Sequence, residues 1–252
     1  MNDQELPLRT AANLKSAGFR HGFTTRCGGV SAAPFQALDF AVLRDPVALR
    51  ENQARLARAV GFDAARLHQA MQVHGGRVLV AGDPAKTLST EADALVAEPT
   101  TEDAVLVRVA DCVPVLLADP ASGRAAAAHA GWRGVEVGVL RATVTHFKGA
   151  RGLLAAVGPS IGACCFEVGE DVAARIGTAA GKDVVARAST PGKVFVDLRL
   201  AVRAQLLALG VDDVEDVPGC TRCDSALFYS YRRDGDASGR LAAVIVARGL
   251  VR

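Results

Sequence analysis

Four short apolar segments follow one another in the middle of the chain, and they restrict the fold more than any other feature. Each is rich in Ala, Val and Leu and is separated from the next by Gly, Asp or Pro; they cover residues 93–97, 104–109, 113–118 and 124–129. Such segments are typical of buried strands. Together with residues 70–80, we expect them to form a central sheet. Hydrophobic residues make up 50% of the chain and aromatic residues only 5%, which predicts a core of small aliphatic side chains, as in layered α/β proteins.

Helical segments and further strands surround this region. The sequence predicts a helix from Asp45-Pro46 to about residue 60, another over residues 135–147, one that starts at residue 168, and one from Asp197, its N-cap, to Leu209. Further strands are expected over residues 19–26, 153–159, 194–196 and 241–248. Because helices and strands alternate imperfectly, we expect an α/β fold with α+β character. It should be a single-domain, mixed-sheet α/β sandwich that spans residues 1–252.

Charge and composition exclude several functional classes. The net charge is +2 and basic residues are scattered among acidic ones, so the sequence shows no nucleic-acid-binding surface. The first residues, MNDQELPLRT, lack the basic start and apolar block of a secretory signal, and no uncharged apolar run approaches the roughly 20 residues of a membrane span. Six cysteines without a repeating framework fit a reducing compartment. We therefore expect a cytoplasmic protein that does not bind membranes.

Four of the cysteines occur in two close pairs. Cys164 and Cys165 are adjacent, and adjacent cysteines rarely bond to each other without strain. Cys220 and Cys223 have the spacing of a redox or metal motif, but a single C-x-x-C lacks the second half of a four-ligand zinc site. We expect Cys220 and Cys223 to be structural thiols.

Three motifs place a metal-binding side chain beside small residues and an apolar strand. They are QVHGG at 72–76, VADCVP at 109–114 and AAHAGWRG at 127–134, and they contain His74, Cys112 and His129. A lone histidine or cysteine on an apolar strand is more often a packed core residue than a ligand. Two imidazoles and one thiolate together, however, suit a zinc ion whose fourth position stays open for chemistry. Asp111 and Arg133 flank these ligands, and a charge beside a buried segment needs a reason.

Seven motifs in order, from about residue 19 to the C-terminus, resemble the bacterial laccase-domain family, once labelled polyphenol oxidases and now viewed as zinc-dependent purine nucleoside phosphorylases. The motifs are HGFTTRCGGVS, QVHGG, EADALV, ADCVPVLLAD, AAAHAGWRG, AVGPSIGACCFEVG and FYSYRRDGDASGR. The resemblance implies that His74, Cys112 and His129 are the zinc ligands and the catalytic centre. It also implies a single α/β sandwich similar to that of toxin deamidases, which use a Cys/His pair.

The resemblance leaves more than one chemistry open. It implies phosphorolysis of adenosine, inosine and S-methyl-5'-thioadenosine, with adenosine deamination as a further activity, so that purine nucleosides and phosphate are the partners. Some members are instead described as editing factors that remove misincorporated serine from peptidoglycan precursors. That task requires amide hydrolysis, for which Cys112 and His129 would form a dyad with a metal-free thiolate. A domain that binds a nucleoside without turnover is a third alternative, and the sequence leaves open whether the chain forms a homodimer.

Three arginines are candidates for substrate binding. Arg26 precedes Gly28 and Gly29, and a guanidinium beside exposed backbone amides suits phosphate; the alternative is an ordinary turn with a solvated arginine. Arg133 either holds phosphate or forms a surface ion pair. Arg232, in the SYRRDG segment, either closes over the nucleoside or belongs to a charged hairpin.

Copper oxidation is disfavoured. A trinuclear copper cluster is built mostly from His-X-His pairs, and the chain has five histidines and no such pair. The three ligands imitate a blue-copper site and can bind Cu²⁺, but Met71, the nearest axial candidate, is expected on the opposite face of its strand from His74.

Zinc-dependent deamination needs a glutamate as proton shuttle, and Glu91 and Glu167 are the candidates.

Overall fold

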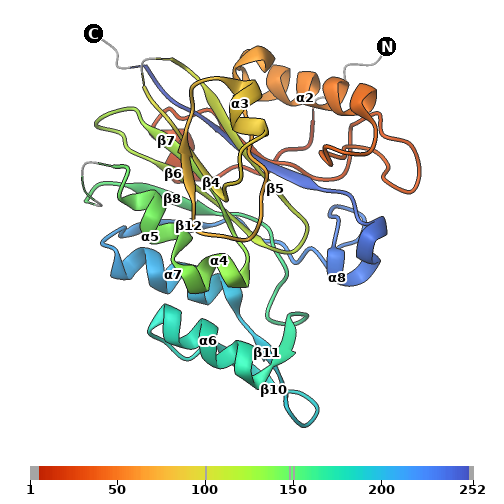
Figure 1. Ribbon diagram of the computed structural model, residues 1–252, viewed down its shortest axis with the longest axis vertical. Helices are drawn as coiled ribbons and strands as arrows, with labels where there is room; N and C mark the ends of the chain where they lie inside the picture. The colour runs from red at the N-terminus through yellow and green to blue at the C-terminus, as the bar shows by residue number, and fades with distance from the viewer. Residues whose placement is uncertain (1–5, 100, 148, 150, 250–252) are drawn as a thin grey trace.

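The chain folds into layers of helices and mixed β-sheets (Figure 1). The computed structural model describes residues 6–99, 101–147, 149 and 151–249. Two sheets pack face to face, and helices cover their outer faces. The predicted mixed-sheet α/β sandwich is confirmed.

The larger sheet has six strands. Its order is β12-β8-β6-β7-β4-β3, with β12 at Asp213–Asp216, β8 at Leu154–Val157, β6 at Val113–Ala118, β7 at Ala125–Ala130, β4 at Ala94–Ala97 and β3 at Val78–Val80. Every residue of β4, β6 and β7 is buried, because one face of this sheet packs against helices and the other against the second sheet. These strands are therefore continuous apolar runs in the sequence and not alternating patterns.

The second sheet contains one of the segments expected in the central sheet. Its order is β1-β13-β5-β2, with β1 at His21–Phe23, β13 at Leu241–Val246, β5 at Ala104–Val109 and β2 at Leu67–His68. The expectation that residues 104–109 join the central sheet is wrong, because β5 pairs antiparallel with β13 over all of its length, from Val109 opposite Leu241 to Ala104 opposite Val246. A strand buried on both faces is apolar whichever sheet it joins, so its sequence does not reveal its partner.

Apolar contacts hold the layers together. Between the sheets, Leu95 and Leu116 of the larger sheet meet Val105 of the second. The outer face of the larger sheet is covered by α4 at Trp132–Val137, α5 at Val139–Val144 and α7 at Leu198–Ala208, and α6 at Glu170–Ala180 packs against α4 and α7. α2, at Pro46–Val60, lies on the opposite side of the sandwich (Figure 1), where Leu56 packs with Leu106 of the second sheet.

Smaller elements complete the fold. β10 at Val185–Ala188, β11 at Lys193–Val196 and β9 at Glu167–Gly169 form a three-stranded antiparallel sheet. Short helices are α1 at Ala12–Ser16, α3 at Pro84–Leu88 and α8 at Tyr231–Asp234, and 3-10 turns lie at Ala64–Arg66 and Gly235–Ala237. Over the part of the chain that the structure describes, no helix is long and apolar enough to cross a membrane.

Local capping signals predicted two helices correctly. Asp45 is the N-cap of α2 and accepts hydrogen bonds from the backbone amides of Val47 and Ala48, and Gly61, in the left-handed region with φ 86°, is the C-cap. Asp197 begins α7 and accepts a hydrogen bond from a backbone amide of its first turn. Both residues satisfy amides that a helix start leaves without an intrahelical partner.

Other boundaries differ from the prediction. The helix expected over residues 135–147 is two short helices, because Gly138 adopts φ 80° between α4 and α5. The helix expected from residue 168 begins at Glu170, after β9. Within residues 70–80, the strand covers only Val78–Val80, because the chain bends at His74, where φ is 61°. The remaining expected strands are present: β1, β8 and β13 are shorter than expected, and β11 begins one residue earlier.

A buried histidine couples the stability of this fold to pH. His21 of β1 donates from Nδ1 to the carbonyl of Phe19 and accepts at Nε2 from the backbone amide of Ala11, both at 2.9 Å. Burial lowers the pKa of His21 from its usual value of 6.5. The neutral ring is also the form that can accept the bond from Ala11.

We expect the free energy of unfolding to fall as the pH drops below about 6.5, because the unfolded chain then binds a proton that the folded chain does not. His21→Gln, whose side chain does not titrate, should lose less stability than the native chain between about pH 7.5 and pH 5.5, as measured by urea unfolding. His68, whose pKa is also lowered by burial, contributes part of the pH dependence of the free energy of unfolding in both chains. Equal losses in the two chains would contradict this role of His21.

Candidate metal centre

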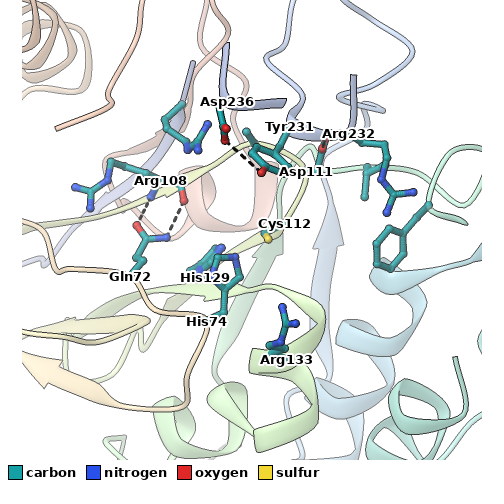
Figure 2. Close-up of a pocket in the computed structure, with 14 residues that line it drawn as sticks. Gln72, His74, Arg108, Asp111, Cys112, His129, Arg133, Tyr231, Arg232 and Asp236 are labelled. Carbon is teal, nitrogen blue, oxygen red and sulfur yellow. Dashed lines mark hydrogen bonds between the residues drawn. The ribbon is translucent and has the colours of Figure 1, made fainter. Parts of the chain in front are cut away.

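The structure brings the three predicted ligands to one point. Cys112 immediately precedes β6, and His129 is in β7 opposite Pro114 of β6, so strand pairing brings the cysteine and the histidine together. His74 approaches from the loop before β3 (Figure 2). The ligand atoms of all three lie within 4.8 Å of one another. The two imidazole rings meet edge to face, with ring centres 4.8 Å apart.

A buried carboxylate fixes the orientation of His129. Asp93, which precedes β4, is completely buried, and its Oδ1 accepts a 2.8 Å hydrogen bond from Nδ1 of His129. Nε2 of His129 is therefore left as the nitrogen that can bind a metal. Burial alone would raise the pKa of Asp93, but hydrogen bonds from His129 and from backbone amides lower it below its usual value. The carboxylate stays ionised as a result.

The same carboxylate shapes the loop that carries His74. It accepts hydrogen bonds from the backbone amides of Val73, His74 and Gly75 at 3.2, 2.9 and 2.7 Å. The φ of 61° at His74 lies in the left-handed region, which residues other than glycine rarely adopt. Three bonds to one ionised carboxylate offset the cost of this conformation. The loop geometry therefore depends on Asp93.

Cys112 and His129 shift each other's protonation. Burial opposes ionisation of Cys112, but the positive charge of His129 and hydrogen bonds from His129 and His74 outweigh it and lower the pKa of the thiol to about 6. Burial also opposes protonation of His129, whereas Cys112 and Asp93 raise the pKa of the imidazole to about 9. Near neutral pH the pair is a thiolate and an imidazolium. Cys112 is then in the form that binds metals or attacks electrophiles.

The backbone leaves room for an ion beside these donors. A Cβ atom at Gly131 would lie 2.9 Å from Sγ of Cys112 and 3.0 Å from Cδ2 of His74. A larger residue at this position would press on both ligands. Two imidazole nitrogens and one thiolate are donors that zinc and copper prefer. The centre therefore has the donor set, the spacing and the space that a transition-metal ion needs.

A cavity of about 660 Å³ opens over the three ligands (Figure 2). Four arginines line it, and they are Arg108, Arg133, Arg232 and Arg240. The acidic residues on its wall are Asp111 and Asp236. A cavity of this size holds a small organic ligand, and the excess of arginine favours one that carries negative charge.

Two of the three predicted substrate-binding arginines lie on this wall. The backbone amide of Arg232 donates to Oδ2 of Asp111 at 2.6 Å, and Nη1 of Arg232 donates to the carbonyl of Glu167 at 2.8 Å. These bonds hold α8 at the rim of the cavity. Arg133, on α4, is exposed, and its guanidinium lies 4.5 Å from the ring centre of Trp132. In Figure 2, Arg133 lies on the His74 side of the cavity and Arg232 on the Asp111 side.

The structure does not bring Arg26 to the cavity. Its guanidinium donates to the carbonyls of Gln36, Ser225 and Pro34 and lies 4.7 Å from the ring centre of Tyr229. These contacts use three of the five N–H donors of the guanidinium. Arg26 therefore holds loops together away from the cavity, and its role in phosphate binding stays a prediction.

Arg108 lines the cavity but was not predicted as a site residue, although the sequence contains an indication of its role. It interrupts the apolar strand β5, and a charge in a buried strand needs partners. Its guanidinium donates to Oε1 of Gln69 and to the carbonyl of Ala70 at 2.9 and 2.8 Å. Gln72, also on the wall, exchanges two hydrogen bonds with its backbone. Burial and the nearby Arg240 lower the pKa of Arg108 to about 10, so the group stays charged at neutral pH.

The candidate proton shuttles and the candidate axial ligand lie elsewhere. None of Glu91, Glu167 and Met71 is among the described residues that line the cavity. Glu167 accepts a hydrogen bond from the hydroxyl of Ser189 and has Lys193 at 3.9 Å. Met71 pairs with Glu91 in an isolated parallel bridge.

Comparison with known proteins agrees with the motifs. Residues 20–248 match the model of a family described as multi-copper polyphenol oxidoreductase laccase. A purine nucleoside phosphorylase of Deinococcus radiodurans is 45% identical over 249 residues, 95% of this chain and 92% of that protein. One of Mycobacterium tuberculosis is 40% identical over 237 residues, 91% of this chain and 92% of that protein. The crystal structure of YlmD from Geobacillus stearothermophilus is similar with a TM-score of 0.84 at 32% identity, over 92% of this chain and 93% of that one. The chain therefore belongs to the multi-copper polyphenol oxidoreductase laccase family.

Proposed function

We propose that the chain is a zinc-dependent purine nucleoside phosphorylase. Its substrates are adenosine, inosine and S-methyl-5'-thioadenosine, which it cleaves with phosphate into a free purine and a sugar 1-phosphate. Relatives at 40–45% identity that carry the name purine nucleoside phosphorylase support this reaction. The observation that carries the proposal is the position of a three-ligand centre and four arginines in one cavity. Residues 1–252 would act as one domain, and six free thiols support the cytoplasm as its compartment.

Zinc suits this centre better than a copper cluster. His74, Cys112 and His129 would hold the ion, and zinc bound there supplies a Lewis acid with an open coordination position. A multi-copper centre needs further histidines close by. His21 and His68 are buried in the second sheet, where His21 bonds to the backbone and His68 lies 3.5 Å from Asp103. Neither is available to the centre.

Arginines supply the phosphate site in this proposal. Arg133 reaches the cavity from α4 and Arg232 from α8. Further positive charge comes from Arg108, in β5 of the second sheet, and from Arg240, which directly precedes β13 of the same sheet. A guanidinium can donate two parallel hydrogen bonds to a phosphate and keeps its charge at all physiological pH values. Arg133 and Arg232 are therefore the groups that we assign to phosphate binding.

Other groups on the wall suit a nucleoside. The hydroxyl of Tyr231 donates to Oδ1 of Asp236 at 3.3 Å (Figure 2), and both groups can exchange hydrogen bonds with ribose hydroxyls. Ile161 and Phe166 add apolar surface against which a purine ring can pack. The cavity thus offers separate partners for phosphate, sugar and base.

Adenosine deamination would be a secondary activity of the same centre. It needs a carboxylate that carries a proton to the leaving amine. Because Glu91 and Glu167 lie away from the cavity, the carboxylates of Asp111 and Asp236 on its wall are better placed for this role.

One observation favours a second chemistry. Asp93, His129 and Cys112 are arranged as an orienting carboxylate, an imidazolium that can protonate the leaving amine and a thiolate nucleophile, a set that can hydrolyse amides. This reaction requires Cys112 to be free of metal, whereas the zinc mechanism requires it as a ligand. Metal content during turnover therefore separates the two.

Removal of any ligand should remove metal and activity together. His74→Ala, Cys112→Ala and His129→Ala should each contain about one zinc ion per chain fewer than the native protein and should lose nucleoside turnover, because two protein donors hold zinc poorly. His146→Ala, a histidine outside the cavity lining, should behave as the native chain. Mass spectrometry measures the zinc, chromatography the turnover and circular dichroism the fold. Undiminished turnover by Cys112→Ala would exclude the zinc mechanism.

Phosphate should be a substrate. With adenosine and phosphate the protein should form adenine and ribose 1-phosphate, and without phosphate it should form neither. Arg232→Ala should raise the KM for phosphate roughly tenfold, the effect of one lost charge-assisted contact. Arg50→Ala, an exposed arginine on α2, should leave this KM unchanged. Free ribose formed at a phosphate-independent rate would show hydrolysis, and binding of adenosine without any product would show a binding domain.

A further inference from the structure

Four cysteines from two distant segments form a cluster beside the cavity. Cys164 and Cys165 lie between β8 and β9, and Cys220 and Cys223 follow β12. Their sulfur atoms all lie within 4.8 Å of one another. Sγ of Cys164 is 3.6 Å from Sγ of both Cys220 and Cys223. Sγ of Cys165 is 3.3 Å from that of Cys223. The second half of the C-x-x-C motif, which the sequence did not reveal, is therefore the adjacent pair.

Backbone contacts build this cluster. Ser160 pairs with Cys220 in a parallel bridge, and the backbone amide of Gly162 donates to Sγ of Cys220 at 3.2 Å. A Cβ atom at Gly162 would lie 3.2 Å from Sγ of Cys164 and 3.4 Å from Sγ of Cys220, so a side chain at this position would crowd both sulfur atoms. An amide donor aimed at sulfur stabilises the charge of a thiolate.

The spacing of the sulfur atoms fits a metal ion and not a disulfide. A disulfide requires about 2.05 Å between sulfur atoms, much less than the distances in this cluster. Four thiolates at about 2.3 Å from one zinc ion would stand about 3.8 Å apart at the corners of a tetrahedron, close to the 3.6 Å of two of the pairs. We propose that Cys164, Cys165, Cys220 and Cys223 bind a second zinc ion in a closed, four-thiolate structural site.

The charges around the cluster suit such an ion. One Zn²⁺ ion enters as four thiols lose their protons, which leaves two net negative charges. Arg222 places its positive charge beside Cys165 and Cys223, and Nη2 of Arg187 donates to the carbonyl of Cys164 at 3.5 Å. Zinc binds such ligands more tightly than Fe²⁺ does. Because protein ligands would fill all four coordination positions, the ion would stabilise the structure and would not take part in catalysis.

The second ion would fix the wall of the cavity that carries Arg232. Thr221, which lies between Cys220 and Cys223 in the sequence, donates its hydroxyl to Oδ1 of Asp111 at 2.6 Å. Oδ2 of the same carboxylate accepts the backbone amide of Arg232 at 2.6 Å. By joining the two cysteine segments, the ion keeps this chain of contacts in place.

Zinc content tests the second site independently of the first. Cys112→Ala, which lacks a ligand of the first centre, should keep about one zinc ion per chain, and Cys220→Ser/Cys223→Ser should also keep about one. Cys27→Ser, a free cysteine outside the cluster, should keep the native content of about two. Cobalt added to the metal-free Cys112→Ala chain should give the intense visible absorption of a tetrahedral thiolate site.

The Cys112→Ala chain decides the matter even if the double variant does not fold. The second site is excluded if this chain, purified without an affinity-metal column, contains no zinc and gives no cobalt absorption. A loss of two hydrogens in the intact mass, which marks a disulfide among the four cysteines, would also overturn the proposal, and so would iron in place of zinc. If the four-cysteine site binds zinc and the three-ligand centre does not, the native chain and Cys112→Ala should both contain about one zinc ion.

Discussion

The ionised carboxylate of Asp93 is the constraint on which the candidate centre depends. It is completely buried and accepts four hydrogen bonds, from Nδ1 of His129 and from three successive amides of the loop that carries His74. A buried charge is unfavourable without such partners, so the partners and the carboxylate hold one another in place. Asp93 thereby determines which nitrogen of His129 faces the cavity and stabilises the uncommon backbone conformation of His74.

The sandwich explains why these groups meet at this place. Pairing of β6 with β7 joins Cys112 to His129, and the loop before β3 adds His74. The second sheet contributes Arg108 through β5, and α4 and α8 contribute the two arginines assigned to phosphate. A further set of contacts runs from the cysteine cluster through Thr221 and Asp111 to α8. The residues that line the cavity therefore come from segments spread between Gln72 and Arg240.

Local signals predicted part of this structure, and long-range pairing hid the rest. Asp45 and Asp197 cap helices through amides only a few residues away. Each metal-ligand motif can likewise be identified from a few consecutive residues. By contrast, residues 104–109 have the composition of any buried strand, so their sheet was predicted wrongly. The partners of Arg108 come from a segment more than 30 residues away. The two cysteine pairs are separated by 56 residues from Cys164 to Cys220, and long-range pairing of the backbone brings them together.

The zinc affinity of Asp93→Asn is the most direct measure of whether this carboxylate organises the centre. Asparagine keeps the size of the side chain but removes the charge that orients His129 and binds the loop amides. Chelator competition in a Cys220→Ser/Cys223→Ser background reports on the three-ligand centre alone. We predict zinc binding about 10- to 100-fold weaker than in the same background with Asp93, as for other groups that orient metal ligands. Unchanged affinity would contradict the central role of Asp93.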